Sequence, residues 1–215
     1  MNRELLTAAA KELHLALTEQ QYEACGLLLQ ELLRWNKKIN LTAITGRDAM
    51  TVKHLVDSLH LVTELRPGDR ILDIGSGAGF PALVLAIARP DCLITSIDAV
   101  GKKISFQKHI DRMLKLANLE PLHGRVEVLA TDRPGGFNLV TSRAFSSLSL
   151  FVELAAPLVS ASGRLISMRG ADGEQEAFYL RESIAAAGLE LEPAVSYRLP
   201  LKMGERSLVI MRKAR

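Results

Sequence analysis

Long apolar runs are missing from this 215-residue sequence. None approaches the roughly 20 residues that cross a bilayer, because Arg, Asp, Glu or Lys interrupts every candidate. Residues 1–4 are followed by charged Lys11 and Glu12, which does not match the apolar core of a secretory signal. We therefore expect a cytoplasmic protein that does not enter a membrane.

Cysteine is also scarce, since the chain has only Cys25 and Cys92. Neither has a second Cys or a His nearby at the spacing of metal ligands, which argues against a zinc centre and against a catalytic disulfide. We expect two buried, reduced thiols and no bound metal.

Neither sign of charge is in large excess. The sequence has 27 Lys and Arg residues and 24 Asp and Glu residues, which gives a formal net charge of +3. Some of the cations stand in pairs, such as Lys37-Lys38 and Lys102-Lys103. A mild basic excess permits a nucleic-acid partner without requiring one.

The residue pattern changes near position 67, where proline and glycine interrupt it. Before this point apolar residues recur at helical spacing. Thr18 and Gln21 match a capping box at the start of one helix, and a further helix is expected to begin at Asp48. We expect residues 1–66 to form a helical cap or RNA platform, and residues 67–215 to form one compact unit.

From residue 70 onward, short apolar runs alternate with helical segments, which is the rhythm of parallel strands joined by helices. The near-continuous hydrophobicity of 93–97 and 137–140 suits central strands covered on both faces. The sequence predicts an α/β, Rossmann-like fold with a mostly parallel, seven-stranded sheet, helices on both faces and an N-terminal helical extension. The expected strands are 70–74, 93–97, 125–129, 137–142, 163–168, 189–198 and 206–212, and the expected helices are 80–88, 101–117, 147–157 and 173–187.

The first expected strand leads into three glycines at alternate positions, Gly75, Gly77 and Gly79, before Phe80 and Pro81 open a helix. Glycines allow a tight turn and let a ligand approach the backbone, and a helix N-terminus offers free amide groups. In a parallel sheet such a turn lies at the carboxyl edge, where ligands bind. We therefore expect these glycines to contact a nucleotide-type cofactor.

Two acids accompany the turn. Asp73 precedes it, and Asp98 ends the second strand at about the interval at which dinucleotide folds place an acid for ribose hydroxyls. Bulky Phe80 stands where a dinucleotide fingerprint has a small residue, and the chain has no Gly-Lys-Ser/Thr to hold a triphosphate. The remaining pattern is typical of S-adenosylmethionine (AdoMet) methyltransferases, so the fold is predicted to be of the class I methyltransferase type.

Each acid also has an ordinary structural alternative. Asp73 either contacts the amino group of AdoMet, directly or through water, or only caps the next helix. Asp98 either holds the ribose hydroxyls or is a solvated carboxylate at a strand end. Glu127, on the strand expected at 125–129, either meets the adenosine or pairs with Arg125 at the surface.

The fourth expected strand ends in Ser142-Arg143-Ala144-Phe145, at the usual place for the chemistry of the methyl acceptor in such folds. It is not followed by an Asn/Asp-Pro-Pro-aromatic run, which aligns an exocyclic amine, or by a Pro-Cys nucleophile. Methylation of adenine amines and of cytosine carbons is therefore disfavoured.

Together the motifs resemble the bacterial glucose-inhibited division protein B family, which methylates N7 of a guanine in small-subunit (16S) ribosomal RNA. The resemblance covers about residue 25 to the C-terminus and rests on residues 40–42, 54–58, 72–81, 142–145 and 204–209. It implies an AdoMet-dependent enzyme that acts on rRNA or a 30S particle as a monomer. The implied cofactor contacts are Gly75, Phe80, Val126, Glu127 and Arg143, and the departures from the family pattern are Ala82, Ala99, Arg169 and Ser207.

Guanine N7 carries an in-plane lone pair at neutral pH, so the implied reaction needs no general base. Catalysis would consist mainly of holding nitrogen, methyl carbon and sulfur in line. An arginine bonded to guanine O6 and N7 would block the nucleophile. Our hypothesis is that Arg143 serves the carboxylate of AdoMet or an RNA phosphate.

Polar residues outside the turn are the candidates for RNA contact. His54 and Asp57, one helical turn apart, are instead expected to form a structural hydrogen-bonded pair. The candidates for RNA contact are Lys37, Lys38, Asn40, Arg169 and Arg206.

Three other functions fit parts of the sequence. One is an AdoMet-binding ribosome-assembly or RNA-binding factor without catalysis. A methyltransferase of small molecules or proteins would share the fold. An NAD-dependent oxidoreductase would share the glycine turn.

Overall fold

The computed structural model describes residues 1–143 and 145–214, so Ala144 of the Ser-Arg-Ala-Phe motif lies outside the described residues. The helices are α1 (Arg3–Glu12), α2 (Glu19–Asn36), α3 (Arg47–Met50), α4 (Asp57–Val62), α5 (Ala82–Ala88), α6 (Gly101–Leu114), α7 (Val126–Asp132), α8 (Leu148–Ala155), α9 (Gly173–Tyr179) and α10 (Arg181–Ala186), with a π-helix η1 (Thr51–Val56) and a 3-10 helix η2 (Pro200–Lys202). The strands are β1 (Arg70–Ile74), β2 (Leu93–Asp98), β3 (Leu119–His123), β4 (Phe137–Arg143), β5 (Val159–Gly170), β6 (Leu189–Leu191), β7 (Val195–Arg198) and β8 (Glu205–Lys213).

The strands form one sheet in the order β3-β2-β1-β4-β5-β8-β6, with β7 paired to β8 outside this path. Strands β1 to β5 are parallel, and β8 runs antiparallel to its neighbours. The mostly parallel α/β fold is confirmed, but the sheet has eight strands instead of seven. The expected strand 189–198 is interrupted at residues 192–194, where Pro193 lacks the N–H that a continuous strand would use.

The strand predicted at 125–129 is wrong. The third strand is Leu119–His123, and residues 126 and 127 lie instead in the first turn of α7. Pro121 weakens the strand signal, but β3 is at the edge of the sheet, where proline is tolerated. The apolar run after it forms a short helix because Val126 and Leu129, three residues apart, are buried on one side.

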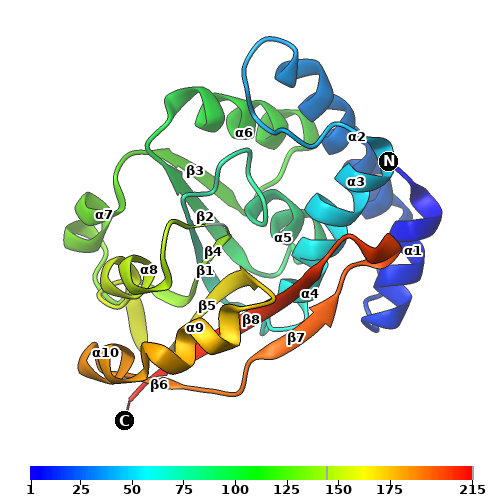
Figure 1. Ribbon diagram of the computed structural model, residues 1–215. Coiled ribbons are helices and arrows are strands. Elements are labelled where there is room, and N and C mark those ends of the chain that lie inside the picture. The colour runs from blue at the N-terminus through cyan, green and yellow to red at the C-terminus, as the bar shows by residue number, and fades with distance from the viewer. Residues whose placement is uncertain (144, 215) are drawn as a thin grey trace.

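Two hydrophobic clusters lie on opposite faces of the sheet, and alternate residues of β1 divide between them. Ile71 belongs to a cluster with residues of α2, α4, α5 and α6, and Leu72 to a cluster with residues of α7, α8 and α10. Figure 1 shows these two groups of helices on either side of the sheet. The first cluster also includes Leu6 of α1, so the N-terminal helices and the sheet share a core.

Two predicted helices are more irregular than their sequence patterns suggest. The helix expected to begin at Asp48 runs through α3, the π-helix η1 and α4, and the helix expected at 173–187 is divided into α9 and α10 at Leu180. A π-helix is wider than an α-helix and is often found at functional sites. No helix among residues 1–143 and 145–214 has the length and apolar character needed to cross a membrane.

The capping box predicted at Thr18 is confirmed. The amide of Gln21 donates to Thr18 Oγ1 at 3.3 Å, and Gln21 Oε1 accepts from the Thr18 amide at 2.8 Å. Thr18→Ala removes the hydroxyl that accepts from the Gln21 amide and is expected to lower the free energy of unfolding by about 1 kcal/mol. Urea denaturation measures the change. Thr45→Ala, at an exposed loop position, is the control, and equal effects of the two substitutions would contradict the capping role.

Candidate functional site

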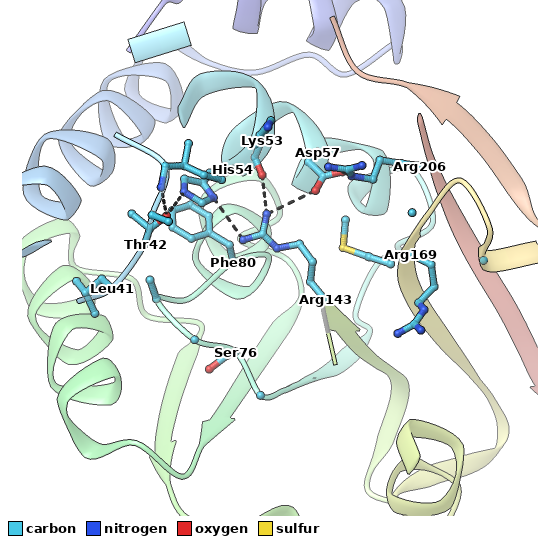
Figure 2. A pocket seen from close by; sticks show the side chains of 18 of the residues that line it. Leu41, Thr42, Lys53, His54, Asp57, Ser76, Phe80, Arg143, Arg169 and Arg206 are labelled. Atoms are coloured by element: carbon cyan, nitrogen blue, oxygen red, sulfur yellow. Dashed lines mark hydrogen bonds and ion pairs between the residues drawn. The ribbon is translucent and has the colours of Figure 1, made fainter. Parts of the chain in front are cut away.

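A pocket of about 750 Å³ opens beside the glycine turn, at the carboxyl ends of β1, β4 and β5. Its walls come from the loop 41–44, the helical segment η1–α4, the glycine turn, the residues after β5, and β8. Figure 2 shows that these segments direct side chains toward a common space. The residues used below that line the pocket are Leu41, Thr42, Ala43, Ile44, Lys53, His54, Asp57, Gly75, Ser76, Gly77, Ala78, Phe80, Lys103, Arg143, Arg169, Asp172, Glu176 and Arg206.

The glycines of the turn divide into two groups. Gly75 and Gly77 line the pocket and have φ values of +66° and +59°, which glycine adopts at little cost. Gly79, with φ of +88°, is buried behind the pocket wall, where an added Cβ would lie 2.5 Å from Leu83 Cδ1. Gly75 and Gly77 are thus placed for ligand contact, whereas Gly79 lets the turn pack against α5.

Asp98 holds the glycine turn from the end of β2. The amide of Gly77 donates to Asp98 Oδ2 at 2.9 Å, and the amide of Val100 donates to Oδ1 at 2.8 Å. Lys103 Nζ lies 3.8 Å from the same carboxylate. Asp98 is only 8% exposed, so the alternative of a solvated strand-end carboxylate does not hold.

Asp73 lies beneath the turn and is fully buried. Its Oδ2 accepts from the Ala82 amide at 3.2 Å, so Asp73 caps the N-terminus of α5, which is the structural role expected as the alternative to ligand contact. Its Oδ1 has no hydrogen-bond partner among the described residues. Burial raises the pKa of Asp73 to about 7, against the lowering effects of the Ala82 amide and Arg143. An unpartnered buried acceptor fits a cationic group such as the ammonium of AdoMet.

Gln107 is a supporting residue that the sequence analysis missed. It is fully buried on α6, where its Nε2 donates to Ser76 Oγ at 2.8 Å and to the Gly77 carbonyl at 2.9 Å, and its Oε1 accepts from Ser96 Oγ at 2.6 Å. The available signal was a lone amide on the apolar face of a predicted helix. Such a residue, when buried, must find partners, and here it fixes the turn.

Arg143, at the end of β4, is held by three acceptors on one helical segment. Its Nη1 donates to the Lys53 carbonyl at 2.6 Å and lies 3.5 Å from Asp57 Oδ2. Its Nη2 lies 3.3 Å from His54 Nδ1. The predicted direct pair of His54 and Asp57 is wrong, because within the described residues both side chains bond to Arg143 instead (Figure 2).

Asp57 has three partners, of which two donate hydrogen bonds and one forms an ion pair. Besides Arg143, it accepts from the hydroxyl of Tyr197 at 2.8 Å and lies 3.9 Å from Arg206 Nε. Asp57 is 4% exposed, so these side chains take the place of water around its carboxylate oxygens.

Val126 and Glu127 follow the carboxyl end of β3, on the same edge of the sheet as Asp98. Val126 is buried, and Glu127 is exposed in the first turn of α7. Neither belongs to the walls of the pocket. They remain candidates for the adenosine end of a cofactor that extends beyond it.

The RNA candidates lie in two places. Lys37, Lys38 and Asn40 are exposed after α2, directly before the loop that lines the pocket. Arg169 and Arg206 line the pocket itself, but each is already paired. Arg169 donates to Glu176 Oε2 and to the Phe145 carbonyl, and Arg206 donates to the Glu205 carbonyl at 3.0 Å.

The pocket wall carries an excess of positive charge. Its cations are Lys53, Lys103, Arg143, Arg169 and Arg206, and its carboxylates are Asp57, Asp172 and Glu176. A cavity with more cations than anions attracts carboxylate and phosphate groups. The site therefore suits a cofactor with a carboxylate and a substrate with a phosphate backbone.

Comparisons with known proteins give matches over nearly the whole chain. A model of the GidB family, described as rRNA small subunit methyltransferase G, matches residues 21–206. The chain is 43% identical over 209 residues to Ribosomal RNA small subunit methyltransferase G of Geobacter sp., covering 97% of this chain and 96% of the relative. It is 44% identical over 186 residues to the protein of the same name from Syntrophotalea carbinolica, covering 86% of each.

Solved structures with the same fold are more distant in sequence. M. jannaschii TYW2 in complex with AdoMet has a TM-score of 0.61 and 12% identity, covering 82% of this chain and 78% of that one. A SAM dependent methyltransferase from Aquifex aeolicus has a TM-score of 0.59 and 16% identity, and the match covers 84% of this chain and 98% of that one. These likenesses confirm the Rossmann-like methyltransferase fold, and the family match confirms the resemblance drawn from the motifs. The chain belongs to the rRNA small subunit methyltransferase G family.

Proposed function

We propose that the chain transfers the methyl group of AdoMet to N7 of a guanine in small-subunit rRNA. As a member of its family, the chain is an AdoMet-dependent rRNA methyltransferase. The position of the methyl group on the base is the finer part of the proposal. We further propose that it acts in the cytoplasm as a monomer, as the resemblance to its family implies.

The observation that carries the N7 assignment is that His54 and Asp57, the two groups beside Arg143 that could accept a proton, are already engaged by other side chains. His54 contacts Arg143 through Nδ1 and Thr42 Oγ1 through Nε2, and burial together with the charge of Arg143 lowers its pKa to about 3. Asp57 is shared by Tyr197 and two arginines. A base whose nucleophilic nitrogen carries no proton, such as guanine at N7, needs no such group.

AdoMet, when bound, supplies a sulfonium methyl group as the electrophile. On the protein side, the backbone at Gly75 and Gly77 lines the pocket and allows close approach of a ligand. Asp73 is buried beneath the turn, and its unpartnered Oδ1 is proposed to accept from the ammonium directly or through water. Arg143 is placed to receive a carboxylate in the same pocket. Rate enhancement would then come from positioning two reactants in one pocket.

Residues 1–66 are proposed to serve as the RNA platform. The exposed residues Lys37, Lys38 and Asn40 lead directly into the loop 41–44, which lines the pocket. Cations in this position would hold phosphates next to the reacting base and make RNA binding dependent on salt.

The direct test uses purified protein, AdoMet labelled in its methyl group and small-subunit rRNA, offered as naked RNA and as 30S particles. Nuclease digestion of the product should release labelled 7-methylguanosine from one of the two substrates. Label in another methylated nucleoside would overturn the N7 assignment, and binding of rRNA without any transfer would favour the non-catalytic assembly factor. A thermal shift with AdoMet but not with NAD is expected, since the oxidoreductase alternative predicts the reverse.

AdoMet binding is expected to depend on pH through Asp73. The pKa of this carboxyl is raised to about 7 by burial, so it is mostly protonated at pH 6 and mostly ionised at pH 8. Because an ammonium favours the ionised form, affinity for AdoMet should rise about tenfold between these values, with release of a proton on binding below pH 7. Calorimetry in two buffers of different ionisation enthalpy measures both effects. The same pH dependence in Asp73→Asn would contradict the assignment.

A further inference from the structure

The guanidinium of Arg143 is fixed along one edge and open along another. The two N–H groups of Nη1 face the Lys53 carbonyl and Asp57, and one N–H of Nη2 faces His54. The Nε–H and the second Nη2–H, which lie on the same side of a guanidinium, have no partner among the described residues. This open pair has the spacing of a carboxylate, and Arg143 lines the pocket.

His54 can hold Arg143 only in one chemical form. A guanidinium has no acceptor, so Nδ1 must accept and the ring must carry its proton on Nε2. That proton is directed to Thr42 Oγ1, 3.1 Å away, in the loop 41–44 that lines the pocket. The burial that keeps the ring neutral therefore also keeps Nδ1 available as an acceptor.

The ring of His54 is itself held in place. It is 4% exposed and is stacked on Phe80, with centroids 4.5 Å apart and planes at 17°. The guanidinium carbon of Arg143 lies 5.6 Å from the centroid of the same Phe80 ring. The π-helix η1 supplies both the Lys53 carbonyl and His54, which brings acceptors for both terminal nitrogens of Arg143 onto one segment. The imidazole thus joins the glycine turn, the loop 41–44 and the end of β4.

We infer that His54 is a positioning residue for Arg143: by accepting at Nδ1, it turns the open edge of the guanidinium toward the carboxylate of AdoMet. This inference rests on the proposed function, because it takes AdoMet as the ligand of the pocket. Both ring nitrogens of His54 are engaged, by Thr42 and by Arg143, so His54 acts on the cofactor through Arg143. Its loss should therefore weaken recognition of one group of the cofactor and leave recognition of the remainder intact.

The test compares AdoMet with decarboxylated AdoMet, which lacks only the carboxylate, by equilibrium binding without RNA. His54→Phe keeps a ring that can stack on Phe80 but removes the acceptor, and it should raise the Kd for AdoMet about tenfold while leaving the Kd for decarboxylated AdoMet unchanged. His54→Asn places an amide oxygen near the position of Nδ1 and should restore most of the preference for AdoMet. Unchanged binding of the decarboxylated cofactor also shows that the variant is folded.

Three results would overturn the inference. An equal rise in both Kd values would reduce His54 to a structural role. Loss of the preference in His54→Asn, with the decarboxylated cofactor still bound, would show that an acceptor at Nδ1 is not what matters. Weaker rRNA binding with unchanged AdoMet binding would assign Arg143 to a phosphate. Failure of the proposed function is distinguishable, because the unsubstituted protein would then fail to bind AdoMet or to methylate rRNA.

Discussion

Arg143→Ala is expected to weaken AdoMet binding about a hundredfold and to reduce methyl transfer by at least as much. Two charge-assisted hydrogen bonds to a carboxylate are together worth about 3 kcal/mol, which corresponds to that factor. The substitution also removes the closest cation from Asp57, which would keep Tyr197 at 2.8 Å and Arg206 at 3.9 Å. Calorimetric titration with AdoMet measures the affinity, and labelled-methyl transfer to rRNA measures turnover.

Two control variants are useful here. One tests whether a positive charge alone at position 143 is sufficient for binding, and the other tests whether loss of an arginine outside the pocket has any effect. Arg143→Lys keeps a cation but not the flat fork, so it should recover only part of the affinity. Arg198→Ala removes an exposed arginine that pairs with Glu205 away from the pocket, and it should change neither measurement. If Arg143→Ala abolished turnover while AdoMet affinity and rRNA binding both stayed unchanged, the assignment of Arg143 to an anionic group would be wrong.

Gly79→Ala is expected to lower the free energy of unfolding by about 3 kcal/mol and to impair AdoMet binding. The residue has φ of +88°, which costs a side chain about 1–2 kcal/mol, and the added Cβ would lie 2.5 Å from Leu83 Cδ1 and 3.1 Å from Gln107 Cγ. Relieving the contact with Leu83 shifts the glycine turn relative to α5, and relieving the contact with Gln107 shifts the side-chain amide that bonds to the Gly77 carbonyl. Urea denaturation and AdoMet titration measure the two effects.

Gly68→Ala is the matched control for this substitution. Gly68 also has positive φ, at +77°, but an added Cβ there would meet no atom within 4 Å. It should cost about 1 kcal/mol, from backbone strain alone, and leave cofactor binding unchanged. Equal destabilisation by the two substitutions would show that the packing of Gly79 against α5 contributes nothing.

Local features of the site were predictable from the sequence. The bounds expected for β1, residues 70–74, are those observed, because an apolar run ends at a glycine turn and both signals are local. Asp98 was expected at the end of β2 and is found there, next to the turn. The third strand was missed because Pro121 opposes strand formation everywhere except at the edge of a sheet, and edge position is a property of the whole fold.

The partners of Arg143 were not predictable in the same way. The Lys53 carbonyl lies 90 residues away in the sequence, and it is available only because the chain folds η1 over the end of β4. His54 and Asp57 were expected to pair with each other because helical spacing is a local signal, whereas the competing guanidinium arrives from a distant strand. The sequence indicated that three arginines, Arg143, Arg169 and Arg206, belong to the functional site, and all three line the pocket. Which acceptors their guanidinium groups bond to is decided by the packing of distant segments.

The most direct test of the central claim is a map of N7-methylated guanines in small-subunit rRNA from cells with and without this protein. Chemical cleavage at 7-methylguanine reports each modified position. We expect one guanine at which cleavage is present in the parent cells, is lost when the protein is absent, and returns when the protein is supplied but not when the Arg143→Ala variant is supplied. No difference at any guanine would contradict it.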